Sequence, residues 1–168
     1  SSEADVKMHI GFLMMPEYTL STFSNAVSVL RMANRLSGRN LYRYSVFSLG
    51  GAPVVSSSGL ELNLHGSLKS VGEMQVLIVC GGYNVKNYCN KQVFDALRGM
   101  AKKNIPLGGI CTGAYVLAAA GLLDGYRSTI HWENIASMRE QFPRLNISSS
   151  LFVIDRDRYT CSDRKSVV

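Results

Sequence analysis

The stretch that decides the fold is residues 106–132, PLGGICTGAYVLAAAGLLDGYRSTIHW. It begins with a short apolar run, reaches Cys111 at a glycine-flanked turn, and continues into an alanine-rich segment that predicts a closely packed helix. A strand that ends at a reactive side chain and turns directly into a helix is how α/β proteins present a nucleophile. The helix N-terminus supplies partial positive charge and N–H groups, which favour a thiolate. Cys111 is therefore the first candidate functional residue.

Strand and helix patterns alternate on both sides of this stretch. Apolar runs and β-forming alternation predict strands at 9–15, 42–49, 73–80, 105–110 and 128–130, and a strand pair at 151–154 and 158–161. Spacing of 3.6 residues predicts helices from a cap at Thr19, Ser21 or Thr22 to about Leu36, and at 90–103, 112–123 and 132–142. Residues 50–59 are turn-rich, and alternating leucines at 60–64 favour a small hairpin or an excursion at the edge of the sheet.

This alternation predicts one α/β domain with an open, mainly parallel sheet covered by helices on both faces. A chain of 168 residues is long enough to bury roughly 70% of its unfolded surface. Ligands of such sheets bind outside the carboxyl ends of the strands. Residues 16–18, 81–83 and 111–112, together with His131, all follow predicted strand ends, so we expect them to converge on one crevice.

Composition excludes several classes of protein. No apolar run approaches the ~20 residues of a membrane span, and no secretory signal is visible. The net charge is +6, but the basic residues are scattered; Arg31, Arg35, Arg39 and Arg43 form a stripe that is more often a solvated face than a nucleic-acid site. Four cysteines without zinc spacing predict reduced thiols in a cytoplasmic protein. We expect no metal and no cofactor.

The order of short motifs carries a family resemblance. Cys-Thr-Gly-Ala at 111–114, Ala-Gly-Leu-Leu-Asp-Gly at 120–125, Ile-His-Trp at 130–132 and Phe-Pro at 142–143 occur in sequence, with His131 twenty positions after Cys111. This pattern resembles the DJ-1/PfpI family within the class I glutamine-amidotransferase-like fold. It is most similar to the GlxA-type branch, in which the domain forms the N-terminal half of AraC-family transcriptional regulators.

The resemblance implies a flavodoxin-like three-layer sandwich and a homodimer. In enzymatic relatives the cysteine is a nucleophile or oxidation sensor, the histidine is its neighbour, and an acidic side chain from the first helix region hydrogen-bonds the thiol. That acidic position falls on Thr22 in this chain. Threonine can donate a hydrogen bond but cannot act as a carboxyl group that tunes a thiol. Glu17 lies five residues too early for the role.

The resemblance also sets the expected domain boundaries. We expect residues 1–162 to form the effector-sensing domain and residues 163–168 to form a tail. The sequence of this tail departs from the pattern of the branch, so it is a candidate for a non-native end. Regulators of the branch continue into a further helix and a helix-turn-helix DNA-binding domain. That domain is absent from these 168 residues, so DNA would be contacted only through a downstream segment.

Two functions remain open. The favoured one is a non-catalytic sensing and dimerisation domain that binds a small metabolite, with nitrogen compounds among the candidates. Its expected ligand-binding residues are Cys111, Thr112, His131, Trp132, Gly81, Gly82, Tyr83, Glu17 and Thr22, with Asn84 and Tyr115 as further candidates. The alternative is a DJ-1/PfpI-type hydrolase or glyoxalase-like enzyme, with Cys111 as nucleophile and His131 moving protons. Oxidation sensing at Cys111 is compatible with the first.

Each candidate also has a purely structural interpretation. Cys111 could be a buried thiol kept in an inherited turn, and His131 could cap the helix that follows it. Trp132, the only tryptophan, could belong to the core. The paired glycines at 81–82 could form a plain tight turn.

Overall fold

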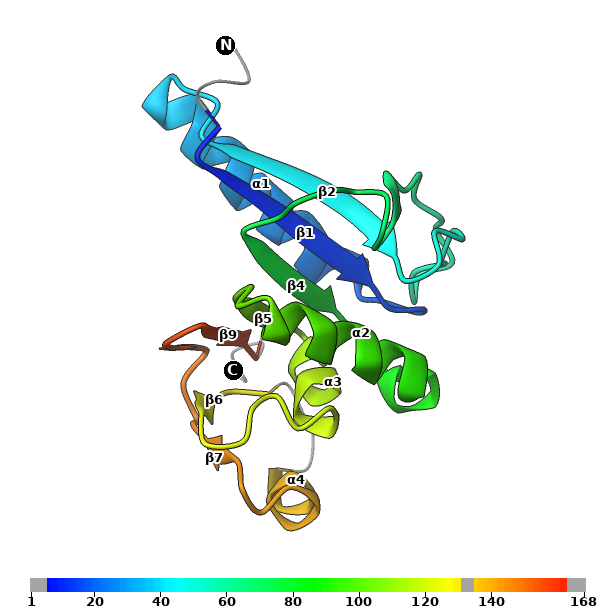
Figure 1. The fold of residues 1–168 in the computed structure, drawn as a ribbon, viewed down its shortest axis with the longest axis vertical. Helices are drawn as coiled ribbons and strands as arrows, with labels where there is room; N and C mark the ends of the chain where they lie inside the picture. Colours follow the sequence, from blue (N-terminus) through cyan, green and yellow to red (C-terminus); the bar gives the residue numbers. More distant parts are fainter. Residues whose placement is uncertain (1–5, 131–134, 163–168) are drawn as a thin grey trace.

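The computed structural model describes residues 6–130 and 135–162, which form an α/β sandwich around a mainly parallel sheet (Figure 1). The strand order is β3-β2-β1-β4-β5-β9-β8, and β8 is antiparallel to β9 while the other neighbours are parallel. The strands are β1 (Met8–Met14), β2 (Tyr42–Ser48), β3 (Gly66–Ser67), β4 (Val76–Cys80), β5 (Leu107–Ile110), β8 (Phe152–Asp155) and β9 (Arg158–Cys161). This confirms the predicted fold class.

Helices cover the sheet unequally. The helical elements are α1 (Leu20–Ser37), the 3-10 helix η2 (Val85–Tyr88), α2 (Lys91–Lys102), α3 (Gly113–Ala119) and α4 (Ile135–Gln141). Figure 1 shows α1 on one side of the sheet and α2 with α3 on the other. A separate two-stranded sheet pairs β6 (Arg127–Ser128) with β7 (Asn146–Ile147).

The alternation of side chains along the central strands produces two apolar cores. In β1, Leu13 faces α2 and α3, whereas Ile10 and Phe12 face α1. In β4, Leu77 and Val79 join the first core and Val76 joins the second. Because both faces of these strands are packed, their sequences are continuously apolar, as expected for parallel strands.

The topology brings the strand ends that precede residues 15–19, 81–84 and 111–112 to one edge of the sheet. From β1 the chain continues to β2 on one side and later returns to β4 on the other, so β1 and β4 flank a topological switch point. Met14 is paired with Cys80, and Cys80 with Ile110. The turns that follow these three residues therefore start side by side.

Several element boundaries differ from the sequence prediction. The hairpin expected around residues 60–64 consists of one isolated antiparallel bridge between Val55 and Glu61, and the edge strand of the sheet lies later, at β3. The helix predicted at 112–123 is shorter in the structure, where α3 ends at Ala119. Two glycines with positive φ, Gly121 and Gly125, follow it. Two-residue strands such as β3 and β7 are too short to show periodicity. The start of the predicted helix at 132–142 lies outside the described residues, and α4 is described from Ile135.

Candidate functional site

Cys111 occupies a strained turn between β5 and α3. Its φ is +54°, in the left-handed region that non-glycine residues rarely adopt, and its side chain is only 6% exposed. Such a conformation costs on the order of 1–3 kcal/mol and persists only where the surroundings enforce it. The surroundings of Cys111 are packed closely enough to enforce it. A Cβ at Gly109 would collide with the backbone of Ala114, and a Cβ at Gly113 would collide with the Val79 carbonyl group. Close packing of β5, β4 and α3 thus fixes the turn.

The hydroxyl group beside the thiol belongs to Thr19. Its Oγ1 lies 3.5 Å from Cys111 Sγ, within hydrogen-bond distance for sulfur. Thr22, expected to face the thiol, is buried and donates its hydroxyl to the Thr19 carbonyl oxygen at 2.9 Å. Thr22 therefore supports the turn that carries Thr19. The sequence suggested Thr19 only as one of three candidate helix caps.

Gly81 and Gly82 allow two loops to approach each other closely. A Cβ at Gly81 would collide with Thr112, and a Cβ at Gly82 would collide with the carbonyl group of Glu17. The Thr112 hydroxyl donates to the Gly82 carbonyl oxygen at 2.5 Å, and Thr19 N donates to the Gly81 carbonyl oxygen at 3.1 Å. The glycine pair is thus required for contact between the strand ends.

Glu17 places a carboxylate at this edge of the sheet. Its φ is +62°, and its backbone N–H donates to the Val55 carbonyl oxygen at 2.8 Å. The carboxylate accepts hydrogen bonds from the Tyr88 hydroxyl at 2.8 Å and from Asn84 Nδ2 at 3.3 Å. The bond to Glu17 is the main reason that the pKa of Tyr88 is raised. Tyr88 also lines a cavity of about 290 Å³ with Met15 and Pro16.

The remaining candidates have different surroundings. Tyr83 is largely exposed. Tyr115 is buried on α3, where its hydroxyl accepts a hydrogen bond from Gln141 Nε2 at 3.0 Å and its ring packs against Phe142. His131 and Trp132 lie outside the described residues. Tyr88 was not singled out from the sequence, because a tyrosine in a short polar segment carries no distinguishing pattern.

A second thiol lies behind the site. Cys80, at the end of β4, is fully buried, and burial together with the neighbouring Cys111 raises its pKa far above the ordinary range for a thiol. Cys80 therefore stays neutral. Burial and Cys80 also raise the pKa of Tyr18, whose hydroxyl has no hydrogen-bond partner within the described part of the chain. None of the four cysteines is in a disulfide.

No metal site or membrane span is evident in the described parts of the chain. Residues 6–130 and 135–162 contain no group of three or more histidine, cysteine or carboxylate side chains placed to hold an ion. No helix in these residues is both long and apolar enough to cross a bilayer.

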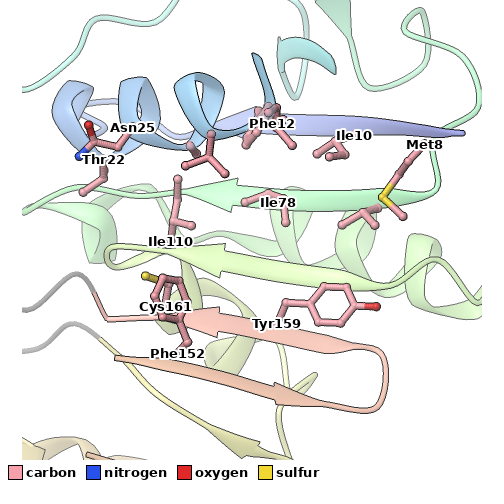
Figure 2. Close-up of a pocket in the computed structure, with 14 residues that line it drawn as sticks. Met8, Ile10, Phe12, Thr22, Asn25, Ile78, Ile110, Phe152, Tyr159 and Cys161 are labelled. Carbon is pink, nitrogen blue, oxygen red and sulfur yellow. The ribbon is translucent and has the colours of Figure 1, made fainter. Parts of the chain in front are cut away.

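Figure 2 shows a separate apolar groove on the α1 side of the sheet. It measures about 610 Å³. Its lining comes from α1 and from five strands: Met8, Ile10, Phe12, Thr22, Asn25, Ala26, Val29, Leu30, Val76, Ile78, Ile110, Phe152, Tyr159 and Cys161. We call it the α1 groove. Among the described residues of this lining, Thr22 is the one that was expected to bind a ligand.

Comparison with known proteins places these features in a family. The family model described as "DJ-1/PfpI family" matches residues 8–166. The chain is 43% identical over 153 residues to the HTH-type transcriptional regulator GbdR of Pseudomonas aeruginosa (strain UCBPP-PA14), covering 91% of this chain and 42% of that protein. It is 39% identical over 163 residues to the HTH-type regulator GlxA of Rhizobium meliloti, covering 96% of this chain and 50% of that protein.

The similarity extends to a solved structure. The crystal structure of an AraC family transcriptional regulator from Pseudomonas putida matches with a TM-score of 0.82 and 31% identity, over 93% of this chain and 84% of that one. The chain spans about half the length, or less, of the two curated relatives described above. The family match over residues 8–166 confirms the resemblance seen in the sequence motifs: the chain belongs to the DJ-1/PfpI family.

Proposed function

We propose that this chain is the effector-sensing and dimerisation domain of an AraC-family transcriptional regulator, and that it binds its ligand without catalysis. The observation that carries the proposal is the similarity of the chain to HTH-type transcriptional regulators. Among the described residues, Thr19 places a hydroxyl group beside the Cys111 thiol. This hydroxyl is not ionised near neutral pH, so it does not take the thiol proton as a carboxylate or an imidazole could.

The ligand would bind at the strand-end site formed by residues 15–19, 81–84 and 111–112. Glu17 supplies a carboxylate whose hydrogen bonds with Tyr88 and Asn84 hold it in place. A carboxylate beside aromatic side chains suits a cationic amine, because both attract positive charge. The site would use Cys111, Thr112, Gly81, Gly82, Tyr83 and Glu17, with Thr22 behind Thr19 and with His131 and Trp132 completing it.

Ligand binding would regulate DNA binding through the rest of the protein. A ligand that prefers one arrangement of the homodimer shifts the population toward it, and so repositions DNA-binding domains joined downstream of residue 162. Such a regulator would act in the cytoplasm. In this proposal the domain itself contacts the effector and its partner subunit, and DNA is contacted only through the downstream segment.

A thermal-shift screen tests this proposal. The purified domain is heated with amino acids, quaternary amines and polyamines; a ligand at 100 times its Kd adds about 2.7 kcal/mol of stability. Glu17→Gln should remove the stabilisation by a cationic ligand. Glu73→Gln, a matched change at an exposed carboxylate that precedes the amino end of β4, at the opposite edge of the sheet, should keep it. A ligand that stabilises both variants equally would contradict the role of Glu17, and the absence of any stabilising compound in these classes would contradict the nitrogen-ligand proposal.

The strained turn at Cys111 favours one second candidate, a cysteine enzyme. In that case Cys111 would attack a carbonyl carbon, and backbone N–H groups of Gly82 and Thr112 would hold the oxyanion. Turnover of methylglyoxal or peptide amides that disappears in Cys111→Ala would establish it. Alanine keeps the same Cβ at the same φ, so this variant changes the thiol without relieving the backbone strain.

A further inference from the structure

Cys80 and Cys111 lie at the carboxyl ends of two neighbouring strands. Cys80 ends β4 and is paired in register with Ile110, the last residue of β5, and Cys111 follows directly. Neighbouring strands lie about 4.8 Å apart and a strand rises about 3.3 Å per residue, which places the two cysteine Cα atoms about 6 Å apart. A disulfide spans Cα separations of about 4.4–6.8 Å, so the two residues are within bridging distance.

The strained turn holds the Cys111 thiol on the same side of the sheet as Cys80. Cys80 belongs to the core on the α1 side. A regular strand would direct Cys111 to the face opposite Ile110. Instead its φ of +54° ends the strand, and its Sγ lies 3.5 Å from Oγ1 of Thr19, at the start of α1. Thr19 N donates to the carbonyl oxygen of Gly81, the residue after Cys80. The Cys111 thiol therefore lies beside the end of β4.

The surroundings of Cys80 indicate that the two thiols interact. Burial, and then the neighbouring Cys111, raise the pKa of the Cys80 thiol. Burial, and then Cys80, raise the pKa of Tyr18. The Tyr18 hydroxyl has no hydrogen-bond partner within the described part of the chain, and an unpaired buried hydroxyl is costly. A hydroxyl donor is thus available close to the Cys80 sulfur when that sulfur loses its proton.

Cys161 is the competing partner by position. It is paired with Ile110 from the other side, at the end of β9, and lines the α1 groove (Figure 2). The contact between Cys111 and Thr19 favours Cys80 over Cys161, because Thr19 is bound to the loop that follows β4. The two candidate partners lie in different strands, so peptide mapping distinguishes them.

We propose that Cys80 is the resolving thiol for Cys111, so that oxidation by a peroxide closes a reversible disulfide between them. In the first step the Cys111 sulfur attacks the O–O bond of hydrogen peroxide. The sulfur keeps one oxygen as a sulfenic acid, and the other oxygen leaves as water. In the second step the Cys80 sulfur attacks the Cys111 sulfur. The S–S bond forms, the S–O bond breaks, and the hydroxyl group leaves with the Cys80 proton as water. Two electrons pass from the thiol pair to the peroxide.

Burial sets the order and the rate of these steps. Cys111 is 6% exposed and Cys80 is 1% exposed, so peroxide reaches Cys111 more readily. The Cys80 thiol is neutral, and a neutral thiol is a slow nucleophile. A second peroxide molecule can therefore compete and carry Cys111 to the sulfinic acid. We expect the yield of disulfide to fall as the peroxide concentration rises.

The disulfide would also change the strand-end site. Cys111 would turn from Thr19 toward Cys80, and the loops that carry Gly81 and Thr112 start at the two bonded residues. Oxidation would then act on the same site as an effector. The chemistry of the thiol pair needs no effector, so the inference goes beyond the proposed function and does not rest on it.

The test oxidises the 168-residue chain with hydrogen peroxide, blocks the remaining thiols with N-ethylmaleimide and maps tryptic peptides without reduction. Trypsin separates all four cysteines, because Cys80 falls in peptide 70–86, Cys89 in 87–91, Cys111 in 104–127 and Cys161 in 159–164. We expect peptide 70–86 to be linked to peptide 104–127, with a mass two hydrogens below the sum of the free peptides. Dithiothreitol should separate the two peptides again.

Cysteine-to-alanine variants assign the resolving thiol. Cys80→Ala should remove the link and lower the fraction of Cys111 that dithiothreitol recovers by roughly tenfold, because Cys111 then proceeds to the sulfinic acid. Cys161→Ala and Cys89→Ala are the matched controls, and both should keep the link between 70–86 and 104–127. The linked peptide in the parent chain tests the proposal even if Cys80→Ala does not fold.

Four results would overturn the inference. A link between peptides 104–127 and 159–164 would make Cys161 the partner. Sulfinic acid as the sole product at Cys111 under stoichiometric peroxide would mean that Cys111 has no resolving thiol, and a Cys111 thiol that stays reduced would mean that it is not oxidised at all. A disulfide between two chains, seen as a dimer on a non-reducing gel, would replace the internal one. A missing disulfide leaves the proposed function standing, and a failed ligand screen leaves the disulfide standing.

Discussion

Gly82→Ala tests whether the strand-end site depends on close approach of two loops. A Cβ at Gly82 would collide with the Glu17 carbonyl group and press on Tyr18 Cα, and these are backbone atoms that no side-chain rotation can move aside. Gly82 does not have a positive φ, so alanine meets no dihedral penalty there. The whole effect must come from displacing the turn that carries Glu17 and Thr19.

We expect Gly82→Ala to lower the free energy of unfolding by about 2 kcal/mol, within the range for overpacked sites. For a domain of this size that corresponds to a loss of roughly 4–8 °C in Tm. The matched control is Gly99→Ala, in α2, where a Cβ would meet nothing within 4 Å. Removing glycine from a helix should stabilise the protein by about 0.5–1 kcal/mol.

Urea unfolding followed by far-UV circular dichroism measures both variants against the parent. Opposite signs for Gly82→Ala and Gly99→Ala are the predicted result. The collision argument would be refuted by a Gly82→Ala protein as stable as the parent. It would also be refuted by a destabilised variant that retains the full response to an effector, because the displaced turn carries Glu17.

Two further predictions concern the core. Burial is the main cause of the lowered pKa of His9, whose ring nitrogens contact the Glu73 carbonyl oxygen at 2.6 Å and Ser45 Oγ at 2.7 Å. The unfolded state therefore binds the proton more tightly, so the free energy of unfolding should decrease as the pH falls below about 6.5. From pH 8 to pH 5, the urea midpoint should decrease less in His9→Gln than in the parent protein. An equal decrease in both proteins would assign the pH dependence to another group. Leu117→Ala, at a fully buried site on α3, should cost about 2–5 kcal/mol in the same assay, and a loss below 1 kcal/mol would contradict its place in the core.

Much of the fold could be predicted because local sequence patterns, such as apolar runs and short motifs, indicate its strands and its family. Continuous apolar runs identified β1, β4 and β5, and the motif order around Cys111 identified the family, which the comparisons confirm. The glycine pair at 81–82 was predicted to follow a strand end, and it does follow β4, which ends at Cys80; the collisions of added Cβ atoms show why glycine is needed at both positions.

Other features depend on contacts between distant segments. Sequence spacing could not decide whether Thr19 or Thr22 faces the thiol, because both lie close to the start of α1. The choice depends on the contact between Thr19 N and the Gly81 carbonyl oxygen, which joins two distant segments. Tyr88 is 71 residues from Glu17, so no local pattern joins them. The α1 groove is a gap between elements and has no sequence signature of its own.

The most direct test of the central claim follows the fate of the ligand. The parent domain and Cys111→Ala are each incubated with the compounds that shift the melting temperature in the amine and amino-acid screen. Binding is measured by calorimetry, and the compounds are then analysed by mass spectrometry. A sensing domain predicts that both proteins bind and that the compounds are recovered unchanged. Chemical conversion by the parent that is absent with Cys111→Ala would contradict the claim and identify Cys111 as a catalytic nucleophile.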